Sequence, residues 1–275
     1  MQVKLGVRFC KAFISKNYAL ELLADSAQGV ESLQRLNALK KDLDLSFIPP
    51  IERRRLSDAS KIAFSLLGSS SLKIPIIFSS QKGEINRCFA MLNDLASHNI
   101  TSPTAFSLSV LNATPALLAI AQKNHSEIVA VSALDALEYG LINAYALLSE
   151  VAQNVGDSCD SADLHPKDCL IISYEEALHS KDICVVMACV SLDLALPQIA
   201  LKMRKDLAND SHKDSGVDSP KDSAKDSCVD SHKTENLSSN LSFLYAVASE
   251  NAHYQNGDFA IDLSDFLKGF NLANI

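Results

Sequence analysis

The residues best placed to do chemistry lie at a sharp bend between a predicted strand and a predicted helix, where residues 132–135 are Ser-Ala-Leu-Asp. In many α/β enzymes such a bend carries the nucleophile, because the backbone lifts that side chain to the mouth of a pocket. This bend contains no cysteine, and Ser132 is its only hydroxyl. A serine nucleophile needs an adjacent base, and Ser132 is more simply interpreted as a helix cap or a strand-end residue.

The strand before the bend is predicted over Ile128–Ala133. It is a short apolar run with β-branched residues at Ile128, Val129 and Val131. A continuous apolar run of this length is typical of a strand that is covered on both faces of its sheet. We therefore expect the bend at the end of a buried strand.

The helix after the bend has an apolar face and two possible caps. Ser132 with Asp135, and Asp135 with Glu138, both have the spacing of a capping box, in which two side chains satisfy free backbone amides. The apolar face consists of four residues at helical spacing, Leu137, Leu141, Ala144 and Leu148. We expect this face to pack on the sheet and to hold the bend in place.

Other apolar segments along the chain predict strands that alternate with helices. Strands are predicted at Val3–Ile14, Lys73–Ser79, Cys169–Tyr174, Ile183–Val190 and Phe259–Leu263. Helices are predicted at 26–41, 51–67, Asn86–His98 and Leu241–Ala248, and 197–207 is expected to form a short helix or an extended connection. Pro75 restricts its strand to an edge or an irregular start. The alternation predicts an α/β fold with a mostly parallel mixed sheet that helices cover on both faces.

A repetitive polar segment interrupts this pattern towards the C-terminus. From Asp210 to Lys233 the pair Asp-Ser recurs six times at a spacing of four. A helix would stack these aspartates at i, i+4, where like charges repel, and almost nothing in the segment can be buried. We therefore expect a domain over residues 1–207, a disordered insert over 208–236, and a C-terminal helix and strand over 237–275 that pack back on the same domain.

Composition and charge exclude several classes of function. The 275 residues are 47% hydrophobic and have a formal net charge of −8, without the clustered Lys and Arg that a nucleic-acid surface needs. The basic triplet Arg53–Arg55 is interpreted as a solvated or carboxylate-paired face. No apolar run approaches the ~20 residues of a membrane span, and charges at Lys4, Arg8 and Lys11 argue against a signal peptide.

The cysteines and histidines give no sign of a disulfide framework or a metal site. The seven cysteines are scattered and form no C-x-x-C pair, which favours buried thiols in a reducing cytosol. His212 and His232 lie in the polar repeat, which is interpreted as a solvated linker rather than a metal-binding array. We therefore expect a cytoplasmic protein with no metal, no other cofactor, and no nucleic-acid or membrane partner.

Three segments carry a resemblance to a known family: Phe47–Phe64 (FIPPIERRRLSDASKIAF), Ile76–Leu92 (IIFSSQKGEINRCFAML) and Ser102–Ala113 (SPTAFSLSVLNA). Together with the small residues of SALDALEYGLINA, they resemble the short β-ketoacyl-synthase-like proteins. That group is similar to the N-terminal half of a thiolase-fold ketosynthase and includes chain-length-factor subunits of aryl polyene biosynthesis. The resemblance extends over about Val3–Val190 and implies a thiolase-like half-fold.

The resemblance implies that the bend is the place where active ketosynthases hold a cysteine. There the helix N-terminus lowers the pKa of the thiol, and its amides stabilise the oxyanion. Matching the helices puts the cysteine position at Leu134, with Ser132, Ala133 and Asp135 as the nearest alternatives. Leucine cannot be acylated. The family's two catalytic histidines belong to the second half of the fold, and His253, in the matching part of this chain, is interpreted as structural or exposed.

The sequence also departs from the pattern of its subgroup shortly before the bend. The resemblance implies a histidine near Leu111 and an Ala-Gly pair where Pro115-Ala116 stands. Thr114 and Pro115 can act as the cap and first residue of a helix, so we expect that helix to begin slightly late.

The missing thiol changes the expected function from catalysis to partnership. The resemblance implies a catalytically silent subunit of the chain-length-factor type, which pairs with a catalytic ketosynthase in fatty-acid-like or aryl-polyene-like acyl chain elongation. It would meet an acyl carrier protein through that partner. The candidate residues for the acyl tunnel or partner interface are Phe106, Ser109, Asn112, Ile128, Val129, Val131, Leu134 and Leu137, and each apolar one is also compatible with ordinary core.

Two other functions stay open at this point. An independent acyltransferase or condensing enzyme would use Ser79, Ser132 or a free cysteine such as Cys10 or Cys88, but no Cys–His or Ser–His pair stands at a recognisable spacing. A structural or scaffolding protein with no acyl ligand is also compatible with the sequence.

Overall fold

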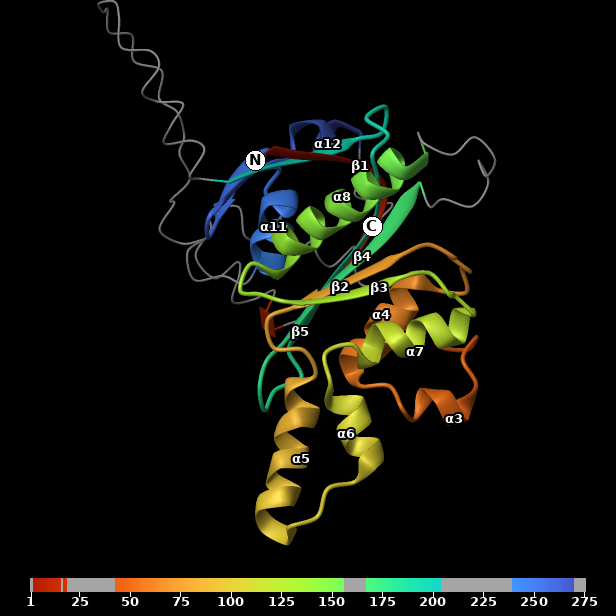
Figure 1. Cartoon of the computed structure of the whole chain (residues 1–275). Coiled ribbons are helices and arrows are strands. Elements are labelled where there is room, and N and C mark those ends of the chain that lie inside the picture. Colours follow the sequence, from red (N-terminus) through yellow and green to blue (C-terminus); the bar gives the residue numbers. More distant parts are fainter. Residues whose placement is uncertain (1, 16, 19–42, 156–166, 204–238, 270–275) are drawn as a thin grey trace, which may run out of the picture.

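An eight-stranded sheet runs through the described part of the chain (Figure 1). This computed structural model describes residues 2–15, 17–18, 43–155, 167–203 and 239–269. The strands lie in the order β3-β2-β4-β5-β1-β6-β8-β7. Their bounds are β1 Gln2–Ile14, β2 Ile76–Ser80, β3 Ile128–Ser132, β4 Asp168–Glu176, β5 Ile183–Ser191, β6 Gln198–Met203, β7 His253–Asn256 and β8 Phe259–Asp262.

The α/β class with a mixed sheet is confirmed, but most neighbouring strands run antiparallel instead of parallel. Among the described strands, the two parallel pairings are those of β2 with β3 on one side and with β4 on the other; the five other pairings are antiparallel. Residues 177–182 join β4 to β5, and residues 257–258 join β7 to β8. Connections this short make hairpins, because a parallel pair needs a longer crossover.

Helices cover both faces of the sheet, as the sequence predicts. Their bounds are α3 Pro50–Arg53, α4 Asp58–Leu67, α5 Ile85–His98, α6 Pro103–Ser109, α7 Ala113–Gln122, α8 Ala136–Val155, α11 Ser239–Ala248 and α12 Ser264–Gly269. One core packs Leu141 of α8 and Phe243 of α11 against Ile171 of β4. The other packs Phe64 of α4 and Leu118 of α7 beneath the opposite face.

The predicted apolar face of α8 is confirmed. Leu137, Leu141, Ala144 and Leu148 are all buried, with at most 4% of each residue exposed. The helix also lies very close to β2: a Cβ added to Gly140 would stand 2.9 Å from Ser79 Oγ. A larger residue at Gly140 would push α8 off the sheet, so glycine is what permits this approach.

The strand before the bend is correctly predicted in position, but it is an edge strand and is not covered on both faces. β3 pairs with β2 alone among the described strands. Val129 and Val131 are half-buried against the core under α8, whereas Ala130 and Ser132 are exposed. The apolar run predicted burial, but the described residues leave its outer edge uncovered.

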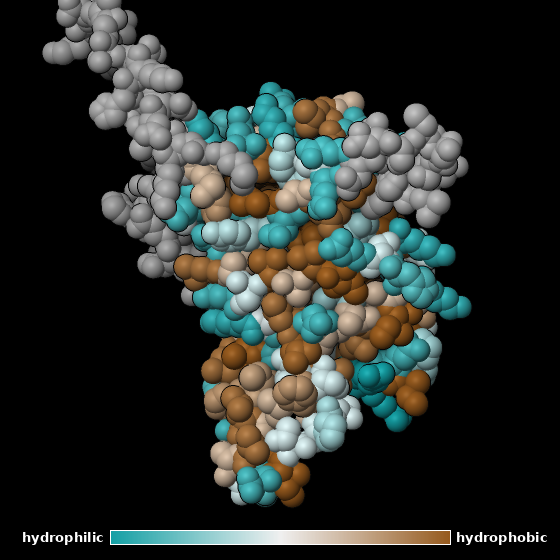
Figure 2. Space-filling view, in the orientation of Figure 1, coloured by the Kyte–Doolittle hydropathy of each residue, from teal (hydrophilic) through white to brown (hydrophobic). Residues whose placement is uncertain are grey.

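Helices α5 and α6 project from the body of the domain as an arm, residues 85–109 (Figure 1). α5 and α6 pack against each other, and α5 has no buried residue. Leu92 and Leu95, two apolar residues of this helix, are 51% and 43% exposed. Figure 2 shows hydrophobic residues gathered over α5 at the lower end of the molecule.

Several other expectations differ in detail or fall outside the described residues. Pro75 stands immediately before β2, an internal strand, so it marks an irregular start rather than an edge. Part of the segment 197–207 forms β6, which lies between β1 and β8. α7 begins at Ala113 with Asn112 at its N-cap position, and not late at Pro115 with Thr114 as the cap. The predicted helix at 26–41 and the Asp-Ser repeat lie outside the residues that the structure describes.

Within the described ranges, no single helix is long and apolar enough to cross a membrane. Helices α6 and α7 reach the length and composition of a span only when taken together, and they are bent by 94° relative to each other.

Candidate functional site

The bend between β3 and α8 exposes a leucine where the family resemblance puts a cysteine. Leu134 is 69% exposed. Ser132, the weaker candidate at the bend, donates its hydroxyl to the backbone carbonyl of Gln81 at 3.3 Å. No described base accepts a hydrogen bond from Ser132 Oγ, so this hydroxyl is not activated for attack.

The N-terminus of α8 is occupied by a side chain from the C-terminal part of the chain. Ser239, at the start of α11, accepts a hydrogen bond from the backbone N–H of Leu137 at 2.9 Å. The Ser239 hydroxyl in turn donates to a carboxylate oxygen of Glu138. Ser239 and Glu138 are both fully buried, at 1% and 0% exposure. A first-turn amide that could face a bound anion is therefore already satisfied within the protein.

Glu138 is the centre of a buried polar cluster rather than half of a capping box. Its other carboxylate oxygen accepts from Asn256 Nδ2 at 3.0 Å, and the same amide nitrogen lies 3.4 Å from Asp135 Oδ1. Burial raises the pKa of Glu138 from 4.5 to about 7, because a dry site disfavours the charged form. Sequence reasoning missed this cluster because Ser239 and Asn256 are more than 100 residues from Glu138 along the chain.

A second buried carboxyl, Glu175 on β4, lies on the same side of the sheet. Burial raises its pKa to about 7, and the nearby charge of Glu138 adds to the rise. Ser79, Ser173 and Asn240 are fully buried beside these elements, and each has polar atoms with no hydrogen-bond partner in the structure. Ser79 lies beneath α8, out of reach of any substrate.

The cysteines offer no replacement for the missing thiol within the described residues. Cys10, Cys169, Cys184 and Cys189 are buried, and Cys88 is half-buried. Burial raises the pKa of Cys10, Cys169 and Cys189 to about 12, and it also raises the pKa of Cys184 well above its usual value, whereas a reactive cysteine needs a lowered pKa. No group of three or more His, Cys, Asp or Glu in this part of the chain could hold a metal ion.

The residues expected at a tunnel or partner interface fall into an exposed group and a half-buried or buried group. Phe106 is 58% exposed on α6, and Asn112 is exposed at the start of α7. Ser109 is half-buried and donates to the carbonyl of Phe106 at 2.9 Å. The members on β3 and α8 are half-buried at Ile128, Val129 and Val131, exposed at Leu134 and buried at Leu137.

The exposed members of this set lie at one end of the sheet. β2 and β3 run parallel, so their C-terminal ends meet there, and the bond from Ser132 to Gln81 joins the bend to the segment that leads into α5. The arm, the bend and the open edge of β3 are thus continuous. We call this combination the open surface.

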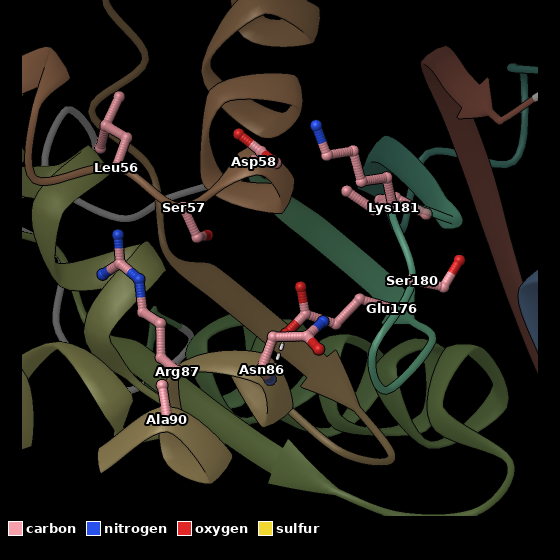
Figure 3. Close-up of a pocket in the computed structure, with 10 residues that line it drawn as sticks. Leu56, Ser57, Asp58, Asn86, Arg87, Ala90, Glu176, Ser180 and Lys181 are labelled. Carbon is pink, nitrogen blue, oxygen red and sulfur yellow. Dashed lines mark hydrogen bonds between the residues drawn. The ribbon is translucent and has the colours of Figure 1, made fainter. Parts of the chain in front are cut away.

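A pocket of about 330 Å³ lies at the base of the arm (Figure 3). It is lined by Leu56, Ser57, Asp58, Asn86, Arg87, Ala90, Glu176, Ser180, Lys181 and Ile183. Figure 3 shows Asn86 and Glu176 facing each other across it; the backbone N–H of Asn86 donates to Glu176 Oε1 at 3.0 Å. The lining contains no histidine or cysteine, and Asn86 and Arg87 are bonded to neighbouring backbone. The pocket is therefore part of the packing at the arm's base.

The mixed sheet, the two helical layers and the strand-to-helix bend define an α/β domain with helices on both faces of its sheet. The chain belongs to the β-ketoacyl synthase N-terminal domain family, whose model matches residues 28–255. The resemblance found in the sequence is therefore confirmed. No curated protein matches the chain.

Two solved structures are similar to this chain. The first is a chain from "Ketosynthase (ApeO) in Complex with its Chain Length Factor (ApeC)" of Xenorhabdus doucetiae, with a TM-score of 0.61 and 16% identity. The match covers 94% of this chain and 98% of that chain, and the thiolase-like fold expected from the resemblance is confirmed. The second is a β-ketoacyl synthase from Burkholderia phymatum STM815, with a TM-score of 0.40, 12% identity, and coverage of 55% and 46%.

Proposed function

We propose that the chain is a catalytically silent ketosynthase-like subunit of the chain-length-factor type. In this proposal it pairs with a catalytic ketosynthase through the open surface, and the pair elongates an acyl chain of the fatty-acid or aryl-polyene kind. The partner carries the nucleophile and receives the acyl carrier protein, and the assembly works in the cytoplasm.

The observation that carries this proposal is the state of the bend. An acyl transfer needs a nucleophile and free donors for the developing oxyanion. Here Leu134 stands where a thiol is expected, and Ser239 occupies the first-turn amide of Leu137. The nucleophile is thus missing and one amide of the first turn is already satisfied, while the strand and helix around the bend are retained.

The open surface supports the pairing. The outer backbone groups of an edge strand are a ready template for another strand, and β3 presents such an edge with Ile128, Val129 and Val131 half-buried beside it. At the same end of the sheet, Leu134 in the bend and Phe106 on α6 are both more than half exposed. Exposed large apolar side chains in one region of a surface are typical of a protein interface, and bulk at these positions could limit the space for a growing acyl chain.

An independent acyltransferase or condensing enzyme has less support. Its three candidate nucleophiles are a serine beneath α8 (Ser79), a serine without a base (Ser132) and cysteines whose described members are buried or half-buried. A scaffold with no acyl ligand would also use the open surface, and it differs from the main proposal in the identity of its partner.

The test is to make the protein with and without a catalytic ketosynthase found near its gene. We expect it to be unstable or aggregated alone and to form a stable one-to-one complex with the ketosynthase, measured by size-exclusion chromatography with light scattering. Incubation with acyl-carrier-protein thioesters should give no mass shift of this chain. A mass shift that disappears in Ser132→Ala would favour the independent enzyme instead.

A further inference from the structure

The arm is fixed at its base by a buried carboxylate. Glu84 stands at the start of α5 and is 1% exposed. One oxygen of its carboxylate, Oε1, accepts hydrogen bonds from Thr114 at 2.6 Å, Ser57 at 3.1 Å and Ser60 at 3.2 Å. Because Ser57 and Ser60 are at the start of α4 and Thr114 is on α7, this single oxygen holds three helices together.

Arg87, one turn further along α5, ties the arm to two more segments. Its Nε lies 3.6 Å from Glu84 Oε2. One terminal nitrogen donates to the carbonyl of Arg55 at 2.7 Å, and the other donates to the carbonyl of Leu108 at 3.3 Å. Arg55 is in the turn before α4, and Leu108 is near the end of α6. The planar guanidinium thus joins the two helices of the arm to the body, a geometry that lysine cannot reproduce.

The hairpin between β4 and β5 holds the same base from the other side. The side chain of Asn86 donates to the carbonyl of Ala177 at 3.0 Å and accepts from the backbone N–H of His179 at 2.9 Å. The rings of Phe89 and His179 pack edge to face with centroids 4.4 Å apart. Gly83, with φ of +59°, supplies the left-handed conformation that turns the chain from β2 into α5.

The far part of the arm contrasts with this base. All residues from 92 to 100 are exposed, and Ile100 and Phe106 are 69% and 58% exposed. A helix pair that buries so little apolar surface gains little orientation from hydrophobic packing. Its direction is therefore set by the polar contacts at the base.

We propose that Glu84 and Arg87 are positioning residues that fix the direction of the arm and so preorganise the open surface for its partner. Preorganisation raises affinity because less conformational freedom is lost on binding. The expected effect on partner binding rests on the proposed function, whereas the expected effect on the direction of the arm does not. Each of these two expectations can therefore be contradicted without the other.

The experiment compares Glu84→Gln and Arg87→Lys with wild type by hydrogen–deuterium exchange of the full chain. Both variants keep side-chain size but weaken the charge-assisted contacts. We expect amides of residues 88–109 to exchange about ten-fold faster, while amides of β5 keep their protection. Unchanged exchange in the arm would overturn the proposal, and so would an equal increase throughout the chain. If Glu84→Gln does not fold, Thr114→Val removes one of the three donors and serves in its place.

Binding to the ketosynthase then separates positioning from general destabilisation. We expect Glu84→Gln to bind about ten-fold more weakly, and Leu95→Ala, at the far part of the arm, to weaken binding as well. If Glu84 acts through the arm, the double variant loses less than the product of the two single effects; a fully multiplicative loss overturns this step. If the wild-type protein does not bind the ketosynthase although its arm exchanges as slowly as expected, the proposed function is contradicted. The positioning role of Glu84 and Arg87 is then decided by the exchange experiment alone.

Discussion

The bend and the arm lie at the same end of the sheet and have opposite surroundings. At the bend, the N-terminus of α8 is closed by Ser239, Glu138 and Asn256, and all three are at least 94% buried. In the arm, α5 has no buried residue, and Leu92 and Leu95 face outward. The first turn of α8, behind the exposed Leu134, is closed by side chains of the chain itself, while within the described residues the neighbouring arm has no cover. A subunit that works through contacts with a partner, as proposed above, would show this difference.

The largest expected effect is on partner binding. Phe106→Asp or Ala130→Lys puts a charge on the arm or on the edge of β3, and a desolvated charge without a partner is costly. We expect more than about 100-fold weaker binding to the ketosynthase, measured by interferometry, with an unchanged melting temperature. Ala195→Lys, the same substitution at an exposed turn far from the open surface, is the matched control. Equal loss in this control would contradict the assignment of the surface.

The next largest effect is the pH dependence of stability, which comes from the buried polar cluster around Glu138. The pKa of Glu138 rises from 4.5 in the unfolded chain to about 7 in the folded protein, and Asp135, Tyr254 and Glu175 face it across the cluster. The folded protein therefore keeps a proton that the unfolded chain has lost. This contribution to stability is complete below about pH 4.5 and is lost as the pH rises through about 7, by about 3 kcal/mol.

Chemical denaturation at pH 5, 6, 7 and 8 measures this dependence. Glu138→Gln should remove most of the slope, because glutamine does not ionise, and Glu175→Gln should remove a part. Glu150→Gln changes an exposed carboxylate on the same helix and should leave the slope as it is. A wild-type protein that becomes more stable from pH 5 to 8 would show that the cluster is ionised or hydrated.

A smaller loss is expected when the hydroxyl that closes α8 is removed. Ser239→Ala leaves the N–H of Leu137 and one oxygen of Glu138 without this partner, which should cost about 2 kcal/mol of unfolding free energy. Ser107→Ala makes the same change on the exposed arm and should stay within about 0.5 kcal/mol. Urea denaturation measures both. If Ser239→Ala and Ser107→Ala lose similar amounts of unfolding free energy, the hydroxyl at the start of α8 is no more important for stability than one on the exposed arm.

The smallest change in stability is expected at the bend itself. Leu134→Cys puts a thiol where the family resemblance places one, at a position that is 69% exposed, and should alter stability by less than about 0.5 kcal/mol. We expect the new thiol to react with iodoacetamide but not to accept an acyl group from a carrier thioester, since the α8 amide is occupied. Intact mass spectrometry distinguishes the two products. An acyl adduct would mean that the bend is more open than the hydrogen bonds indicate.

Local patterns in the sequence predicted those parts of the fold that local physics determines. The spacing of Leu137, Leu141, Ala144 and Leu148 located the buried face of α8, and the β-branched runs located β4 and β5. Strand direction was less predictable, because it depends on which strands become neighbours. β1, the first strand, lies between β5 and β6, and nothing in its own residues specifies that place.

Exposure and the candidate site were harder to predict, for two physical reasons. An apolar run has the same pattern whether it packs on its own core or on a partner, so β3 was expected to be covered on both faces. The cluster around Glu138 depends on Ser239 and Asn256, which the fold brings from beyond the Asp-Ser repeat. The family resemblance was enough to show that Leu134 stands where a thiol is expected. The hydrogen bond from the Leu137 N–H to Ser239, at the N-terminus of α8, could be seen only in the structure.

The most direct test of the central claim is the mass of the species formed when this protein is made with its neighbouring ketosynthase. Light scattering on the eluted peak gives that mass, and Ala130→Lys with its Ala195→Lys control shows whether the open surface is responsible. The account predicts a one-to-one complex that Ala130→Lys alone abolishes. A well-behaved monomer that ignores the ketosynthase, or a complex that survives Ala130→Lys and Phe106→Asp together, would contradict it.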